Sequence, residues 1–335
     1  MTAYSYLSID HGAGNLKLHG AHGSIIMPTR AATARDGHLS SAAGLRIGKP
    51  PLRIQTDGWQ IYVGDTAHNW GRAIDDLSDA RFITGAPGTR AVTYAAITHY
   101  ILEHGLHCHL QNMTLYVGLP HTALSGDDAA ETVRGVKSWL KGEHKWQVNN
   151  SPYYMDVADV VITTQAAGAL FDYLLDDDGQ FRPGKAQQYR QKEIGVLSVG
   201  MNTIELMAVN GRQVTQKFTS GETLGVRRLL ELCDPGNLYT RGELDAKLRA
   251  GTLDTSSTLS VWSSEVNGHI ERVWGRAWRR FAAVVVVGGG AMLLRERILA
   301  QFNGRTYIPS DPVGAIARGL YKMAQQHESR KRRRG

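Results

Sequence analysis

Two segments of this chain, 188 residues apart, share the same arrangement of glycine and polar residues. The first is DHGAGNLKL, which begins at Asp10, and the second is SVGMNTIEL, which begins at Ser198. In both, a β-rich stretch leads into a glycine-containing turn and a returning stretch, which is the pattern of a β-hairpin. A chain that repeats one hairpin at such a distance is expected to contain a duplicated core. We therefore predict two related halves, each opening with a glycine turn.

The segments around the hairpins alternate between helix and strand patterns, which is typical of a mixed α/β sheet flanked by helices. Apolar spacing predicts helices over 91–104, 129–140, 165–171, 224–232, 270–281, 292–301 and 313–324. Runs of β-branched and aromatic residues predict strands over 59–63, 114–118, 160–163 and 284–287. A polar stretch over 234–260 is expected to be rich in loops. Glycine makes up 37 of 335 residues, well above the usual share, which indicates many tight turns.

This order of elements predicts two domains. The first covers residues 1–160, contains an inserted subdomain over about 30–85, and is completed by residues 312–329. The second covers residues 161–311. Residues 330–335 form a basic tail without apolar side chains, which we expect to be disordered.

The net charge of +7 is concentrated in that tail. Five of the charges come from residues 330–334, so the rest of the chain carries only +2. The tail could contact DNA phosphates or acidic surfaces of neighbouring subunits, or it could be a solvated end without a partner.

The composition excludes several classes of protein. Apolar residues make up 42% and charged residues 21%, which excludes a mostly disordered or coiled-coil chain. Two cysteines cannot form a disulfide framework, and the longest apolar run, over 281–294, is too short to span a bilayer. With no evident signal peptide, we expect a soluble cytoplasmic protein that does not associate with membranes.

The first turn holds the residue types that a nucleoside triphosphate site requires. Gly12 and Gly14 would let backbone N–H groups converge on a phosphate, and Lys17 would supply a cation. Asp10 would hold Mg²⁺, through water. An ordinary hairpin with a charged rim is the alternative. The spacing fits neither a P-loop nor the dinucleotide-binding fingerprint.

Two further glycine turns support a nucleotide site. The turn at Gly200 would close on the same phosphates from the other half of the chain. Gly288, Gly289 and Gly290 follow an apolar strand and would let a base and ribose lie against the backbone. Each turn alone is common. Their order, with an alanine-rich helix between the hairpins and a final helix at the end, favours nucleotide binding.

The order of these motifs resembles that of the actin-like ATPases, and among them the ParM-type filament proteins of bacteria and plasmids. The similar segments are DHGAGNLKL and LSVGMNTIEL (the two phosphate motifs), TQAAGALF and DPVGAIARGLYKMA (the two connecting helices), and VVVVGGGAMLL (the adenosine motif). The resemblance implies an α/β, actin-like two-domain fold, with duplicated ribonuclease-H-like cores and a nucleotide cleft between them.

The resemblance also implies roles for individual residues. Asp10 would hold Mg²⁺ and Gln165 would position the attacking water, while Gly314 and Gly319 would lie where the second connecting helix crosses the first. ATP or GTP would be bound by residues from three turns: Gly12, Ala13, Gly14, Asn15, Lys17, Gly200, Met201, Asn202, Thr203, Gly288, Gly289 and Gly290.

The implied function is that of a cytomotive filament. ATP binding would drive head-to-tail self-assembly and hydrolysis would drive disassembly, in plasmid or DNA segregation and with a DNA-bound adaptor as a further partner. One departure from the family stands out, because Ser198 occupies the position of an aspartate. A nucleotide-binding scaffold with little hydrolysis is therefore an alternative. A small-molecule kinase of the same fold is another, although no acceptor-binding motif is evident.

Histidines and a cysteine crowd the end of the helix predicted over 91–104 and the turn after it. They are His99, His104, His107, Cys108 and His109. Neutral histidine and thiolate are metal ligands, but no second ligand pair with recognisable spacing accompanies them. We interpret the group as a helix terminus with capping histidines.

Overall fold

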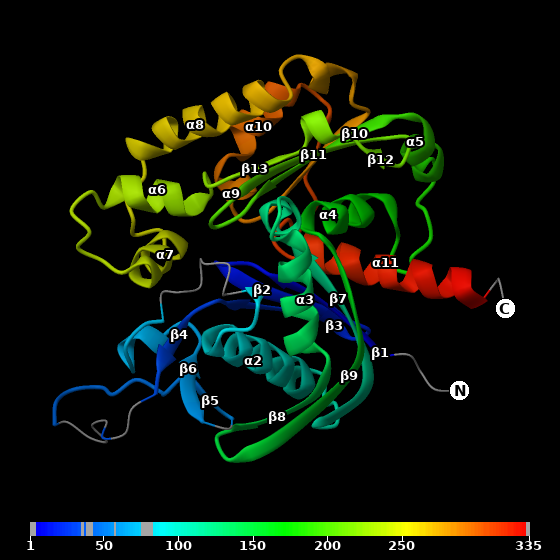
Figure 1. The fold of residues 1–335 in the computed structure, drawn as a ribbon. Coiled ribbons are helices and arrows are strands. Elements are labelled where there is room, and N and C mark those ends of the chain that lie inside the picture. The colour runs from blue at the N-terminus through cyan, green and yellow to red at the C-terminus, as the bar shows by residue number, and fades with distance from the viewer. Residues whose placement is uncertain (1–4, 35–36, 38–42, 57, 75–82, 333–335) are drawn as a thin grey trace.

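The computed structural model describes residues 5–34, 37, 43–56, 58–74 and 83–332. These residues form two lobes, each built on one β-sheet, with two helices between the sheets (Figure 1). The mixed α/β architecture predicted from the sequence is confirmed.

The first lobe holds a nine-stranded sheet in the order β3-β2-β1-β7-β9-β8-β5-β6-β4. Its strands are β1 (Ser5–His11), β2 (Asn15–Gly20), β3 (Gly23–Pro28), β4 (Ala31–Thr33), β5 (Leu52–Thr56), β6 (Trp59–Val63), β7 (His109–Leu119), β8 (Gly142–Val148) and β9 (Ser151–Thr164). Helices α2 (Pro87–Glu103) and α3 (Ala129–Leu140) belong to this lobe, as do the short helices η1 (Ala67–Asn69) and η3 (His121–Leu124). The segment predicted as an insertion supplies β4, β5 and β6, which join the sheet through β8.

The second lobe holds a six-stranded sheet in the order β12-β11-β10-β14-β15, with β13 also paired to β11. Its strands are β10 (Glu193–Val199), β11 (Ile204–Asn210), β12 (Gln213–Val214), β13 (Ser220–Glu222), β14 (Ala283–Val287) and β15 (Thr306–Tyr307). Its helices are α5 (Lys185–Gln191), α6 (Val226–Cys233), α7 (Arg241–Arg249), α8 (Thr258–Val273), α9 (Gly290–Leu293) and α10 (Arg295–Phe302), and the short helices are η4 (Gln216–Phe218) and η5 (Ala277–Arg280).

The two sheets repeat one topology. β1 pairs antiparallel with β2 and parallel with β7, while β10 pairs antiparallel with β11 and parallel with β14. The register repeats as well, because Asp10 lies opposite Lys17 and Ser198 lies opposite Glu205. The predicted duplication is therefore confirmed down to single cross-strand pairs.

Helices α4 (Gln165–Leu174) and α11 (Ala315–Arg332) cross between the lobes. A Cβ added to Gly319 would lie 1.9 Å from the carbonyl oxygen of Gly168, so only glycine permits the observed crossing. Gly314, which we expected at the same crossing, instead lies before α11, where an added Cβ would meet Asp311 Oδ2 at 2.3 Å.

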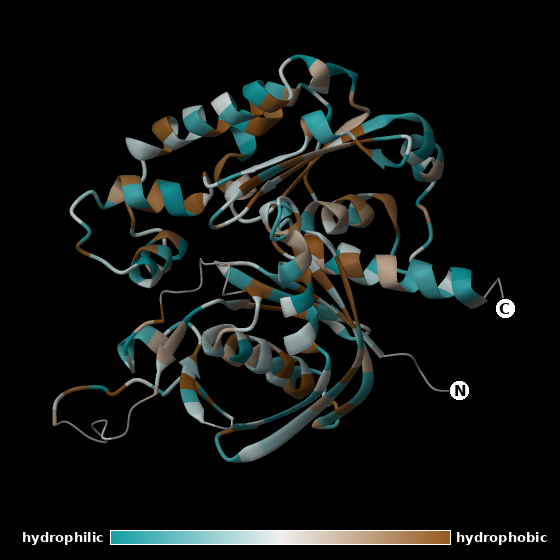
Figure 2. Cartoon of the chain, viewed as in Figure 1, coloured by the Kyte–Doolittle hydropathy of each residue, from teal (hydrophilic) through white to brown (hydrophobic). Residues whose placement is uncertain are grey.

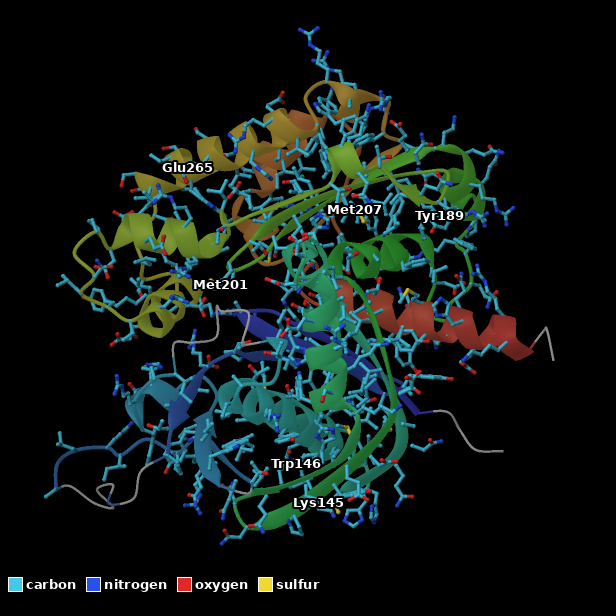
Figure 3. The ribbon with its side chains drawn as sticks, viewed as in Figure 1. Lys145, Trp146, Tyr189, Met201, Met207 and Glu265 are labelled. Carbon is cyan, nitrogen blue, oxygen red and sulfur yellow. The ribbon has the colours of Figure 1, made fainter. Side chains whose placement is uncertain are left out.

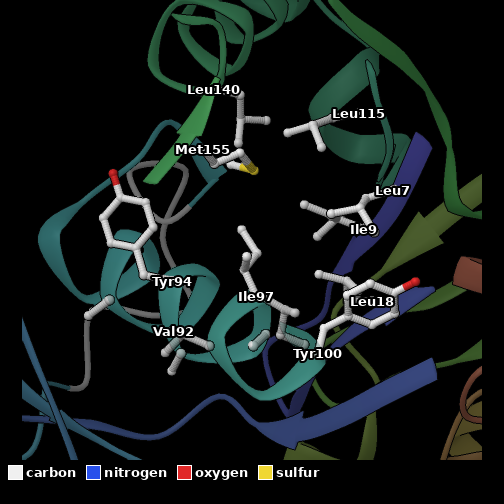
Figure 4. Packing of buried hydrophobic residues seen from close by; sticks show 14 of the residues in the cluster. Leu7, Ile9, Leu18, Val92, Tyr94, Ile97, Tyr100, Leu115, Leu140 and Met155 are labelled. Atoms are coloured by element: carbon white, nitrogen blue, oxygen red, sulfur yellow. The ribbon is translucent and has the colours of Figure 1, made fainter. Parts of the chain in front are cut away.

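Each lobe has its own apolar core (Figure 2). The core of the first lobe lies between its sheet and α2, where Leu7, Ile9, Ile97 and Leu115 are buried (Figure 4). Two further clusters cover the two faces of the second sheet, and the one on the inner face includes residues of α4 and α11. Within the described ranges, no helix is long and apolar enough to cross a membrane.

Three predictions in the second lobe differ from the structure. The stretch 234–260, expected to be loop, contains α7 and the start of α8, and Thr240 and Glu243 form a capping box at the start of α7. The helix expected over 270–281 ends at Val273, because Gly275 has a φ of +48° that terminates it. The helix expected over 292–301 is divided into α9 and α10.

The tail also differs from the prediction. Helix α11 continues through Arg332, so residues 330–332 are helical, and residues 333–335 lie outside the described part of the chain. Lysine and arginine are good helix formers, and their charges are favourable at the C-terminal end of a helix. Lys331 Nζ also lies 2.9 Å from a carboxylate oxygen of Glu328, one turn earlier.

Candidate functional site

A cavity of about 730 Å³ lies between the lobes, and every site residue predicted from the sequence lines it. Those residues are Asp10, Gly12, Ala13, Gly14, Asn15, Lys17, Gln165, Gly200, Met201, Asn202, Thr203, Gly288, Gly289 and Gly290. They come from the β1–β2 hairpin, the start of α4, the turn between β10 and β11, and the segment from the end of β14 to the start of α9. The fold thus brings together four segments that are far apart in the sequence.

Asp10 organises the first turn. Its side chain is fully buried at the end of β1, and Lys17, its cross-strand neighbour, places Nζ 2.9 Å from Oδ2. The amide Nε2 of Gln165, the first residue of α4, donates a hydrogen bond of 2.6 Å to Oδ1. Asp10 therefore fixes both the cation and the amide that border the cavity.

At Gly12 and Gly288 the glycine turns approach neighbouring atoms too closely for a side chain. A Cβ on Gly12 would lie 2.6 Å from both the Asn15 carbonyl oxygen and Lys17 Nζ. Gly288 has a φ of +92°, and a Cβ there would lie 2.3 Å from the Val199 carbonyl oxygen. The turns consequently present backbone rather than side chains to the cavity, as a phosphate-binding loop does.

Two buried amide oxygens in these turns have no hydrogen-bond partner among the residues that the structure describes. They are Asn15 Oδ1, at the start of β2, and Asn202 Oδ1, just before β11. Both residues line the cavity. Buried polar atoms are normally paired, so these two oxygens fit a site that a polar ligand completes.

Glu205 is a buried carboxylate that the sequence analysis did not assign to the site. It lies opposite Ser198 on β11, and its Oε1 accepts a 2.8 Å hydrogen bond from the backbone N–H of His121 in the first lobe. Burial raises the pKa of Glu205 to about 7; the His121 bond lowers it and the charge of Asp10 raises it further. Glu205 occupies the position in the second hairpin that Lys17 occupies in the first, and this equivalence was the signal that could have identified it.

His11 lines the cavity and also lies outside the predicted set. Burial, together with the charge of Lys17, lowers its pKa to about 4, so the ring is neutral at pH 7. The hydroxyl of Thr93 donates to the Thr89 carbonyl, so His11 Nε2, 3.0 Å away, donates to the Thr93 oxygen. This bond holds the imidazole against α2.

The site fits a metal ion held through water better than one bound directly by the protein. Within the described residues, no three histidine, cysteine or carboxylate side chains are grouped so that they could hold a metal. This includes the histidines at the end of α2. Asp10 alone offers a carboxylate among the predicted residues, and its oxygens already contact Lys17 and Gln165.

An ion-pair chain closes the same cleft near the cavity. Arg30, which precedes β4, donates to Asp245 of α7 at 2.5 Å and to the carboxylate of Asp65 at 3.1 Å. Asp245 also accepts from Arg249, and these two α7 residues line the cavity. A ligand in the cavity would thus lie beside the pair that joins the lobes.

A double-mutant cycle on Arg30 and Asp245 should show coupling of about 1–3 kcal/mol in the free energy of unfolding, measured with urea. The coupling arises because the Arg30–Asp245 pair is almost fully buried. The same cycle on Arg30 and Asp65 should give less than about 1 kcal/mol, because Asp65 is exposed and water screens its charge. Equal coupling in the two cycles would contradict a buried interlobe pair.

Comparison with known proteins identifies the fold. Residues 8–168 match the family described as the N-terminal domain of actin-like proteins. No curated protein matches the chain by sequence. The apo structure of the psk41 ParM protein is 13% identical, with a TM-score of 0.72 and 98% of each chain covered.

Two further solved structures are similar over the whole chain. A ParM from a 15-stranded filament of Clostridium botulinum is 15% identical, with a TM-score of 0.73, 97% of this chain covered and 100% of that one. The archaeal actin homologue Ta0583 in complex with ADP is 15% identical, with a TM-score of 0.67 and coverage of 98% and 99%.

The chain is therefore a protein with the actin-like two-domain fold. Its residues 8–168 match the N-terminal domain of actin-like proteins, and its fold as a whole resembles that of the ParM-type filament proteins.

Proposed function

We propose that this chain is a cytoplasmic ATPase whose binding of ATP drives head-to-tail assembly into a cytomotive filament for plasmid or DNA segregation. The observation that supports this most is the convergence of three glycine turns from both lobes on one cavity, together with Asp10, Lys17 and Gln165. A DNA-bound adaptor is the further partner in this proposal. Contact of residues 330–335 with DNA is a separate part of it.

The cavity residues divide into groups by chemistry. Lys17 and the backbone of the turns at Gly12–Gly14 and Gly200–Thr203 would bind the phosphates of ATP or GTP. Gly288–Gly290 would lie along the nucleoside. Asp10 would hold Mg²⁺ through water, and the ion would neutralise charge on the phosphates.

The bond between Gln165 and Asp10 supports a role for Gln165 in orienting a water. Its Nε2 is committed to Asp10, so the orientation of the amide is fixed. The carbonyl oxygen of that amide is then the atom that accepts a hydrogen bond from an attacking water. Gln165 would act by orientation rather than by removing the proton, because an amide is not a base.

Self-assembly would follow from occupancy of the cavity. A ligand that contacts turns of both lobes fixes the lobes relative to one another and so fixes the surface each subunit presents. A head-to-tail contact between such subunits is heterologous and extends into an open filament. Among the similar structures are a ParM and Alp12 in filaments.

A nucleotide-binding scaffold with little hydrolysis is the second candidate, and Ser198 is the observation that favours it. Ser198 is buried at the position where the family has aspartate, so the second phosphate turn lacks that carboxylate. The nearest substitute, Glu205, has a pKa raised to about 7 by burial and therefore carries only part of a charge at neutral pH.

Light scattering and pelleting with ATP, with ADP and without nucleotide test the proposal, and phosphate release in the same samples separates ATPase from scaffold. We expect polymer with ATP and its decay as phosphate is released. The variant Asp10→Asn keeps the shape of the side chain. Its rate of phosphate release and its polymerisation with ATP should both fall by at least about 100-fold, consistent with loss of charge stabilisation at a phosphate site.

Gln165→Ala is the matched variant for the hydrolysis step. It should still polymerise with ATP, but the polymer should persist because water is no longer oriented. A protein that stays monomeric under all three nucleotide conditions would refute filament formation. Polymer without phosphate release would support the scaffold instead.

A further inference from the structure

One side of the second lobe carries cations from three separate elements. Arg190 and Lys192 lie at the end of α5, Arg212 in the turn between β11 and β12, and Arg330 near the end of α11. All four side chains are exposed. We call these four residues the α5–α11 patch. None of them has a carboxylate partner within 4.0 Å among the residues that the structure describes.

Three observations link the elements that carry the patch. A Cβ on Gly211 would lie 3.3 Å from the Arg190 carbonyl oxygen, so the β11–β12 turn touches the end of α5. Burial raises the pKa of Tyr189 on α5, while the charges of Arg212 and Arg330 both act to lower it. Tyr189 lies on the same side of the molecule as α5 and the C-terminal end of α11 (Figures 1 and 3).

The patch stands on a rigid support. The Tyr189 ring packs edge-on against Phe171 of α4, with centroids 6.0 Å apart, and at the same centroid distance from Phe181. These contacts pack the Tyr189 ring against the protein and hold α5 to α4, the helix that lies between the lobes. The cations are fixed in place by packed elements rather than carried on a loose loop.

Nearby carboxylates are already occupied by other cations. Glu193 pairs with Arg280, and Glu328 pairs with Lys331. Asp177 pairs with Lys322. The charge of the patch is therefore not cancelled within the chain, although residues 1–329 together carry only +2.

The exposed side chains next to the patch are hydrogen-bond donors rather than apolar anchors. The side chains of Gln187, Gln191 and Gln213 are exposed on the same elements. Of the large apolar side chains exposed in the described part of the chain, only Val214 belongs to β12, α5 or α11. Arginine, lysine and glutamine are the side chains that contact phosphate oxygens of nucleic acids.

From this chemistry we infer that the α5–α11 patch binds the phosphate backbone of double-stranded DNA without sequence preference. The guanidinium group of arginine can bind a phosphate through two hydrogen bonds. Several separate cations can contact successive phosphates, whose charges are regularly spaced along duplex DNA. Single-stranded DNA is disfavoured because stacking requires an exposed aromatic face, and Tyr189 is packed against two phenylalanines. An acidic protein segment is disfavoured because such interfaces use a buried apolar or aromatic anchor.

The test measures fluorescence anisotropy of a labelled 30-base-pair duplex of mixed sequence with the full chain, without nucleotide, between about 50 and 200 mM salt. The patch variant is Arg190→Ala, Arg212→Ala, Arg330→Ala. The matched control removes three exposed arginines from other elements, with Arg134→Ala, Arg295→Ala and Arg297→Ala. Circular dichroism and the thermal midpoint check that both variants are folded.

We expect the patch variant to bind the duplex at least about 10-fold more weakly than the unaltered chain and to reduce the slope of log K against log salt by about three. The control should change affinity by less than about twofold. Absence of duplex binding by the unaltered chain, or equal loss in both variants, would overturn the inference. Tighter binding of labelled polyglutamate than of DNA through the same patch would assign the surface to an acidic protein instead.

This inference does not depend on filament formation. Pelleting of the patch variant with ATP reports assembly separately, so loss of DNA binding and loss of assembly are distinguishable. A patch variant that assembles normally but no longer binds the duplex is the expected combination.

Discussion

Replacing Asp172 with alanine should lower the free energy of unfolding by about 3–5 kcal/mol, because it leaves two buried or partly buried cations without their carboxylate. Asp172 lies on α4, and its oxygens accept two hydrogen bonds from Arg318, at 2.8 and 2.7 Å. Lys322 Nζ donates to the same carboxylate at 3.0 Å. Asp172 and Lys322 are both almost fully buried at the crossing of α4 and α11.

Asp177→Asn is the matched control in the same network. Asp177 also pairs with Lys322 at 3.0 Å, but its side chain is 92% exposed, so removing its charge should cost less than about 1 kcal/mol. Asp172→Leu combined with Lys322→Met should recover much of the loss, because it removes both buried charges together. Urea midpoints measure all of these. A cost for Asp172→Ala no larger than that for Asp177→Asn would contradict the role of the buried carboxylate.

The network matters beyond stability because of where it lies. Gly168 and Gly319 bring α4 and α11 into backbone contact between the sheets, and Asp172 joins the same two helices one turn further on. Gln165, at the start of α4, reaches Asp10 in the cavity. A change in how the helices cross would therefore move the amide that borders the ligand site.

The sequence predicted those parts of the site in which local backbone geometry restricts which residue can stand at a position. Gly12 and Gly288 stand where no side chain fits, and Asp10 and Lys17 are cross-strand neighbours in a short hairpin. Such features depend on local geometry, which a motif records directly. For the same reason the duplication could be predicted from one repeated hairpin.

The parts that the sequence did not predict depend on contacts between distant segments. Glu205 is significant only because the lobes bury it against the His121 backbone and near Asp10. Arg30 and Asp245 meet across the cleft although 215 positions separate them. Helix α7 has low apolar content, so the sequence predicts loop there. The spacing of Thr240 and Glu243 is that of a capping box and could have indicated the start of a helix.

Glu205→Gln should stabilise the protein at pH 8 by about 3 kcal/mol and change its dependence on pH. Burial raises the pKa of Glu205 from 4.5 to about 7. Below pH 4.5 the carboxyl is protonated in both the folded and the unfolded chain, so its contribution to stability is complete. Between pH 4.5 and 7 the unfolded chain loses the proton first, and stability falls as the pH rises. Glutamine keeps the oxygen that accepts from His121 and carries no charge.

Two histidines act in the opposite direction. Burial lowers the pKa of His11 and of His19 to about 4, so the unfolded chain binds protons that the folded chain does not, and stability falls as the pH drops from 6.5 towards 4. In the unaltered chain Glu205 offsets part of this slope. In Glu205→Gln the histidine slope is unopposed, so stability should rise more steeply between pH 5 and 6.5.

Thermal or urea midpoints at pH 5, 6.5 and 8 measure this difference. The advantage of Glu205→Gln over the unaltered chain should grow by about 2 kcal/mol from pH 5 to pH 8, because most of the proton loss from Glu205 falls in that interval. Glu296→Gln, at an exposed carboxylate of α10, is the control and should show no such growth. If the advantage of Glu205→Gln were the same at pH 5 and pH 8, Glu205 would titrate as an ordinary carboxyl. The second phosphate turn would then contain a fully charged carboxylate at neutral pH, and the case for a weakly hydrolysing scaffold would lose its support from Ser198.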